Sequence, residues 1–221
     1  MELEDRWRMI RELLDMHGRG FAGELGIRVT NNPARLFGLV CLGTLSQPGI
    51  DPRKAAGAAR ALFDHGWTTS QEFAASSEEE RAEVLAEANY PGDVPKVARA
   101  LGDSAEMVVQ RYDGDLREVR SKADGDPERL RELLSQMPGM SSAALDVFLR
   151  DVQAIWQEIA PFADPRALAA AKNLELADSA DELLELVRAG GAEKLAWLVG
   201  ALVLVDLEQE YDEVQRRMQA G

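Results

Sequence analysis

Two segments of the chain combine residue types and spacings that could support chemistry. The first is the proline–glycine bend Met137-Pro138-Gly139-Met140-Ser141, which joins two apolar-periodic runs at 126–136 and 142–156. Backbone amides at such a bend, with a helix starting directly after it, suit a phosphate because a helix N-terminus carries partial positive charge. The second segment holds a lone carboxylate, Asp164, directly before a proline. This carboxylate could stabilise a developing positive charge or activate water, and it could equally be only the N-cap of a helix.

The elements that must position these segments are predicted to be helices throughout. Apolar residues recur at helical spacing over 3–17, and 34–45 is a mostly apolar run that we expect to form a central helix. The run 195–205 is too short to cross a bilayer, so we interpret it as part of a buried helix that continues to about residue 215. No alternating pattern of useful length indicates a strand. The sequence therefore predicts an all-α fold.

The order helix, proline–glycine hairpin, helix and carboxylate resembles the helix-hairpin-helix superfamily of base-excision DNA glycosylases, which includes endonuclease III. The resemblance extends over about residues 30–205, most of the chain. It implies two helical subdomains with an interdomain cleft. One subdomain would combine the chain start, 1–30, with the chain end, 160–221. The other would comprise 31–159 and contain the helix-hairpin-helix motif at 126–156.

In that superfamily the hairpin reads roughly Leu-Pro-Gly-aliphatic-Gly and holds DNA through backbone amides. Gly139 matches the first glycine, whereas Ser141 stands in the place of the second. The resemblance implies DNA contacts at Gly139, Met140, Ser141 and Ser142. A serine is compatible with a phosphate contact, but its side chain crowds a backbone that glycine would leave open. A plain helix–turn–helix connection is the alternative interpretation of the bend.

The reaction that the resemblance implies is limited by one missing residue. Ala143 occupies the position where bifunctional members carry the lysine that attacks the sugar, so Schiff-base strand cleavage is not expected. Arg150 lies roughly 10 Å further along the helix and is too basic to replace that amine. Asp164 matches the superfamily's catalytic aspartate. We therefore expect a monofunctional DNA N-glycosylase that acts on a damaged or mismatched duplex. The alternative is a catalytically silent binding or scaffolding module on the same fold.

Two further loops are predicted to approach DNA. In the superfamily a glutamine fills the gap left by an extruded base; Gln47 lies one position before that place, and Pro48 occupies it. Tyr90, in the turn 89–92, is a candidate for stacking on a base, and Lys96 is a candidate phosphate contact. A simple turn at Gln47 and ordinary packing of Tyr90 are the alternative interpretations.

Charge and cysteine content restrict these functions. The chain has 25 basic and 39 acidic residues, a net charge of −14, which opposes attraction to DNA at long range. Its single cysteine, Cys41, excludes an intramolecular disulfide and a four-cysteine iron–sulfur cluster. His17 and His65 are expected to make helix-end contacts rather than to bind metal, so no cofactor is predicted. We also expect a cytoplasmic monomer without a membrane span.

Overall fold

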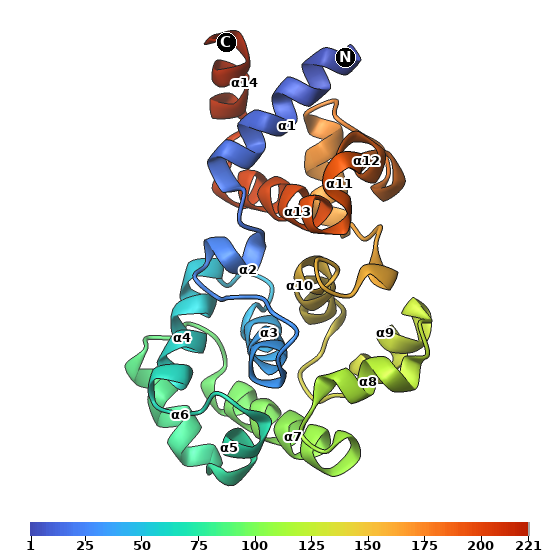
Figure 1. Cartoon of the computed structure of the whole chain (residues 1–221). Coiled ribbons are helices and arrows are strands. Elements are labelled where there is room, and N and C mark those ends of the chain that lie inside the picture. Colours follow the sequence, from blue (N-terminus) through green and yellow to red (C-terminus); the bar gives the residue numbers. More distant parts are fainter. Residues whose placement is uncertain (221) are drawn as a thin grey trace. The chain divides into compact units, whose positions relative to one another are not determined.

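The computed structural model describes residues 1–220, and every regular element within them is helical (Figure 1). The prediction of an all-α fold is therefore confirmed. None of the helices in this range is long and apolar enough to cross a membrane. In chain order the elements are α1 (Leu3–His17), α2 (Phe21–Glu24), α3 (Pro33–Leu45), α4 (Pro52–Asp64), α5 (Ser70–Ala75), α6 (Glu78–Glu87), α7 (Val94–Tyr112), α8 (Leu116–Ala123), α9 (Pro127–Ser135), α10 (Ser142–Val152), η1 (Gln157–Ile159), α11 (Pro165–Asn173), α12 (Ala180–Leu186), η2 (Arg188–Gly190), α13 (Gly191–Glu208) and α14 (Tyr211–Ala220).

The chain divides into two compact units. One comprises residues 1–24 together with the chain from 149 onward, and the other comprises 25–148. Both boundaries come earlier in the chain than the division at 30/31 and 159/160 expected from the sequence. A sequence pattern suggests boundaries at turns, whereas the second boundary lies inside the continuous helix α10.

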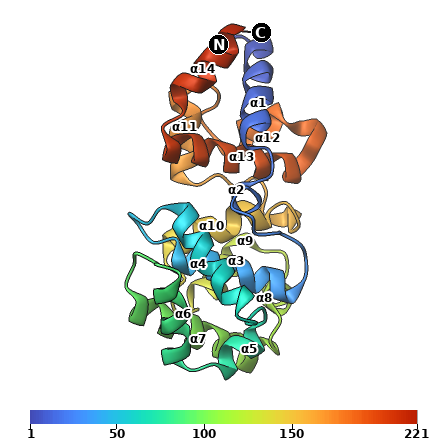
Figure 2. The same cartoon turned by 90° about the vertical axis from the view of Figure 1, so that its left-hand side faces the viewer.

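The unit that contains both chain ends is built around α13. Residues 198–205 of this helix are all buried, which confirms the interpretation of the apolar run. Helices α1, α2, α11 and α12 pack against α13, and Figure 2 shows α1 running down onto it. Gly200 permits a very close contact, because a Cβ there would lie 2.4 Å from the backbone nitrogen of Phe21. A larger residue at position 200 would push α2 away from the core.

Two helices end earlier than their apolar patterns predict. Helix α13 stops at Glu208 because Gln209 adopts a left-handed conformation with a φ of 57°, and the Glu210 amide bonds back to the Val205 carbonyl. The expectation of one helix to about residue 215 is therefore wrong, and α14 is a separate helix. Helix α10 likewise stops at Val152 rather than at residue 156. Apolar residues keep a helical spacing across both breaks, so this spacing gives no sign of either.

The other unit is arranged around α3, which confirms the predicted central helix. Its residues 36–45 are buried, and α4, α7 and α8 pack against it. Asn32 caps its start by accepting the Ala34 amide at 3.0 Å. Near its other end, a Cβ on Gly43 would lie 2.7 Å from the Ala144 carbonyl oxygen. This close approach holds the start of α10 against α3 and so positions the bend that precedes α10.

Polar side chains cap several helix starts. Asp51 and Asp126 accept backbone amides at the starts of α4 and α9. Ser77 and Glu80 form a capping box at α6. Asp164 accepts two amides at the start of α11. The short helices α2, α5 and α8 are not anticipated by hydrophobic spacing.

Candidate nucleic-acid interface

The bend between α9 and α10 is exposed at its tip and anchored on either side. The side chains of Met137 and Met140 are buried, whereas Gly139 and Ser141 are exposed. Gly139 has a φ of +81°, and a Cβ there would lie 2.8 Å from Cγ2 of Thr44. The turn therefore requires glycine at this position. The Met140 side chain is buried and its amide donates to the Met137 carbonyl at 3.1 Å, so Met140 has no free donor for the DNA contact expected of it.

Ser141 is the N-cap of α10. Its carbonyl accepts the Leu145 amide at 2.9 Å, and its Oγ accepts the Ala144 amide at 3.2 Å. The sequence motif indicates a serine that is compatible with a phosphate contact but crowds the backbone, and it gives no sign of the cap. The hydroxyl instead satisfies one of the amides that a helix start leaves without a partner.

Other amides at the bend remain available. Within residues 1–220, the backbone amides of Gly139, Ser142 and Ala143 have no hydrogen-bond acceptor. They lie at the positive end of the α10 dipole, on a segment whose tip is exposed. This combination suits one anionic oxygen group, such as a phosphate. Ala143 itself is half-buried in the first turn of α10 and brings no amine to this place.

The predicted glutamine and lysine lie in the same unit as the bend, Gln47 directly after α3 and Lys96 in the first turn of α7. Gln47 is half-buried in the turn directly after α3, one turn from Thr44, which contacts Gly139. Lys96 is exposed and lies four residues before Ala100, whose Cβ would be 3.1 Å from a Cβ on Gly139. Positions four apart share a helix face, so Lys96 lies on the side of α7 that faces the bend.

Tyr90 is explained by packing rather than by an exposed ring. Its side chain is 5% exposed, and its hydroxyl donates to the Leu45 carbonyl at 2.8 Å. Burial, with a contribution from Asp93, raises the pKa of Tyr90 to about 12. The hydroxyl therefore stays protonated and ties the turn 89–92 to the C-terminal end of α3. The buried ring is not available to stack on a base, contrary to the stacking predicted for Tyr90.

Asp164 is buried and fully hydrogen-bonded. Its Oδ1 accepts the amides of Arg166 at 3.0 Å and Ala167 at 3.3 Å, so the predicted N-cap is present. Its Oδ2 accepts Nε of Arg150 at 2.9 Å, and both side chains of this pair are about 95% or more buried. The carboxylate is thus held in one orientation with an opposite charge beside it.

The sequence does not indicate that Arg150 pairs with Asp164, because 14 residues separate them. Its guanidinium carbon lies 4.4 Å from the centroid of the Phe21 ring, at a distance typical of a cation–π contact. Its Nη1 is buried without a hydrogen-bond partner. The two N–H donors of Nη1 are therefore unused, beside the Nε that binds Asp164.

Comparison with known proteins was made at the levels of sequence and structure. No family model and no curated protein matches the sequence. A non-covalent endonuclease III–DNA complex is similar in structure, with a TM-score of 0.57, 16% identity and 99% of each chain covered. A trapped endonuclease III–DNA covalent intermediate, the estranged-adenine complex, gives a TM-score of 0.56 and 16% identity, with 93% of this chain and 86% of that chain covered. This chain has the endonuclease III fold. The predicted helix-hairpin-helix glycosylase architecture is thereby confirmed as a fold.

Two further polar residues lie in the last turn of α10 and just after it. Gln153 donates to the Phe162 carbonyl at 2.9 Å and accepts the Phe162 amide at 3.1 Å, which fixes the segment that leads to Asp164. Asp151 accepts the Ala22 amide at 3.0 Å. Burial raises the pKa of Asp151 to about 7, although Arg150 and the Ala22 amide both act to lower it. Polar residues at 150, 151 and 153 interrupt an apolar run, and that interruption is the signal by which they could have been found.

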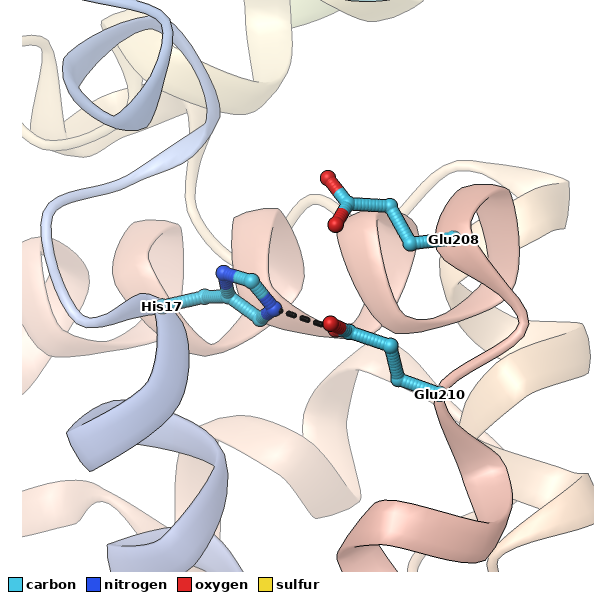
Figure 3. Close-up of side chains that lie close together, drawn as sticks. All are labelled: His17, Glu208 and Glu210. Atoms are coloured by element: carbon cyan, nitrogen blue, oxygen red, sulfur yellow. Dashed lines mark hydrogen bonds and ion pairs between the residues drawn. The ribbon is translucent and has the colours of Figure 1, made fainter.

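One group of possible metal ligands occurs in the described part of the chain. Ligand atoms of His17, Glu208 and Glu210 lie within 4.8 Å of one another (Figure 3). Nε2 of His17 is 2.6 Å from Oε2 of Glu210. This contact joins the C-terminal end of α1 to the break between α13 and α14, and it is the helix-end contact expected of His17. His65 lies at the end of α4, where its ring contacts that of Trp67 at a tilt of 49°, with centroids 4.2 Å apart.

Proposed function

We propose that the chain binds duplex DNA and releases a damaged or mismatched base without cutting the strand, as a monofunctional DNA N-glycosylase. The observation that carries the proposal is the exposed bend at Gly139, where the amides of Ser142 and Ala143 are free at a helix start. A DNA phosphate satisfies such amides well. The similar solved structures are endonuclease III bound to DNA, which supports the same use of the fold here.

The proposed reaction follows from the roles that the resemblance to the glycosylases implies for individual residues. Gln47 would occupy the gap left by the extruded base, Lys96 would contact a phosphate, and Asp164 would stabilise the sugar as it becomes cationic. With Ala143 in the place of a lysine, water rather than an amine adds to the sugar carbon as the base leaves, so the product is an intact strand with an abasic site. This role requires Asp164 to exchange Arg150 for the sugar when DNA is bound.

A DNA-binding module without catalysis is the second candidate, and the Arg150–Asp164 ion pair favours it. A cation 2.9 Å from the carboxylate cancels most of the field that would stabilise a charged sugar. The net charge of −14 also weakens attraction to DNA. Both candidates use the bend in the same way, so they differ only in whether a base is released.

Binding at the bend is tested with Ser142→Asp. The new carboxylate stands at the start of α10, where it stabilises the helix and repels a phosphate. In fluorescence-anisotropy titrations with duplex DNA, at low and at moderate salt, we expect the affinity to fall about tenfold. Ser179→Asp makes the same change of charge at the start of α12 and should bind as the wild type does. Equal affinities for all three proteins would remove the bend from the proposal.

Base release is tested on duplexes that contain uracil, a mismatched base or an alkylated base. The wild type should produce strand breaks only after alkali treatment, and Asp164→Asn should produce none. Asparagine still caps α11, and circular dichroism and thermal unfolding then show whether the variant is folded. Binding of every duplex without base release from any of them would favour the module without catalysis.

The absence of strand cleavage is tested by restoring an amine. Ala143→Lys should form an adduct with lesion-containing DNA that borohydride traps, whereas the wild type should form none. Ala143→Arg supplies the same charge without a usable nucleophile and is the matched control. An adduct trapped with the wild type would show that another amine attacks the sugar.

A further inference from the structure

A cavity of about 460 Å³ lies at the N-terminal end of α3, within the unit 25–148. Arg28 and Arg35 contribute its charged side chains, and Ile27 and Phe63 contribute apolar surface. Its volume falls in the range of small-molecule sites, which are concave and largely apolar with a few polar groups that fix orientation.

The two arginines are uncompensated. Both are exposed, and within residues 1–220 neither forms an ion pair or a side-chain hydrogen bond. None of the residues that line the cavity is acidic. Glu72 contacts the lining at Thr68, whose amide and hydroxyl it accepts. In a chain of net charge −14, this makes the cavity a place of local positive charge.

The walls of the cavity are held in place by other contacts. Arg60 donates to the Leu25 carbonyl and so restrains the loop that carries Arg28. Asn32 caps α3 through its Oδ1, which leaves its amide nitrogen as a further donor beside the cavity. The donors therefore come from a loop and a helix that are both fixed.

The cavity is distinct from the bend proposed to bind DNA. Helix α3 has 13 residues, which corresponds to a length of about 20 Å. The cavity lies at its first turn, around Ala34, whereas Thr44 in its last turn contacts Gly139 of the bend. A duplex held at the bend and a ligand in the cavity would thus occupy opposite ends of the same helix.

We propose that this cavity binds a small phosphate ester of mononucleotide size. Arginine guanidinium groups match phosphate oxygens in a bidentate geometry, and two of them compensate the charge of a phosphate monoester. Ile27 and Phe63 would take the apolar part of the ligand, such as a base. The site requires no residue of the bend and no Asp164, so it stands apart from the proposed glycosylase reaction.

Isothermal titration calorimetry with the full chain tests the proposal, with AMP, adenosine and inorganic phosphate as probes. AMP should bind more tightly than either adenosine or phosphate, because only AMP fills both parts of the cavity. The double variant Arg28→Gln with Arg35→Gln should weaken AMP binding by about a hundredfold, about tenfold for each charge-assisted contact. The variant with Arg99→Gln and Arg129→Gln changes the same number of exposed arginines elsewhere and should bind AMP as the wild type does.

Three results would overturn the proposal. The first is the absence of AMP binding to the wild type at millimolar concentration. The second is AMP binding that is equal in the wild type and in a folded Arg28→Gln, Arg35→Gln variant. The third is a loss of duplex-DNA affinity in that variant without any AMP binding to the wild type, because the arginines would then serve nucleic acid. Unchanged duplex affinity together with lost AMP binding supports the proposal, whatever the outcome of the base-release assays.

Discussion

Asp151→Asn should remove a pH dependence of stability that the wild type shows. The carboxyl of Asp151 has its pKa raised from 3.8 to about 7 by burial. Between these two values the folded protein binds more protons at this group than the unfolded chain does. The free energy of unfolding therefore falls as the pH rises through this window, and this contribution is constant below about pH 4 and above about pH 7.

The magnitude follows from the size of the shift. About three pKa units correspond to about 4 kcal/mol over the whole window. Because the isoelectric point is near 4.6, the practical range begins at about pH 5.5, and about 2 kcal/mol of the change lies above it. Asparagine has no proton to lose and can still accept the Ala22 amide, so the variant should lack this slope.

Urea unfolding at pH values from about 5.5 to about 8.5 measures the effect as the difference between the two proteins. The groups shared by wild type and variant cancel in that difference. Asp103→Asn, at an exposed aspartate on α7, is the control and should follow the wild type at every pH. If the Asp151→Asn and wild-type curves run parallel within a few tenths of a kcal/mol, the carboxyl is not desolvated as the structure indicates.

Two further changes test the packing around the candidate site. Arg150→Gln should lower the free energy of unfolding by about 3–5 kcal/mol, because it leaves the buried Asp164 carboxylate without its cation. Adding Asp164→Asn to this variant should recover most of the loss. A loss below about 1 kcal/mol for Arg150→Gln would contradict the ion pair. Gly139→Ala should lower the free energy of unfolding by about 1 kcal/mol more than Gly125→Ala does. Both glycines have a positive φ, 81° and 78°, but only a Cβ at position 139 would meet a neighbour within 4 Å. Equal losses of free energy for the two variants would mean that Thr44 moves away from the new Cβ without an energetic cost.

Much of the fold could be predicted because its signals are local. Asp51 and Asp126 before prolines, and Ser77 three residues before Glu80, cap helices wherever the chain places them. The break at Gln209 could not be predicted in this way, because apolar spacing continues beyond it and the left-handed turn is stabilised by backbone contacts. The unit boundary inside α10 could not be predicted from local sequence either, because it depends on the tertiary contacts of each half of that helix.

The candidate site was predictable at the bend and less so around Asp164. A proline–glycine pair between two periodic runs indicates a turn whatever its surroundings. The partner of Asp164 comes from Arg150, 14 residues earlier, and only the folded chain brings the two together. Tyr90 shows the converse error: a turn sequence suggests exposure, yet the ring is buried and its hydroxyl is used by Leu45.

The hydroxyl of Ser141 closes the first turn of α10 from within the chain. The bend consequently keeps its shape before any partner arrives, since one donor is already satisfied and its neighbours are held in place beside it. An incoming anion would then find a rigid set of donors, and little ordering entropy would oppose its capture. A glycine at this position would permit closer approach, but the loop would have to be immobilised at the moment of contact.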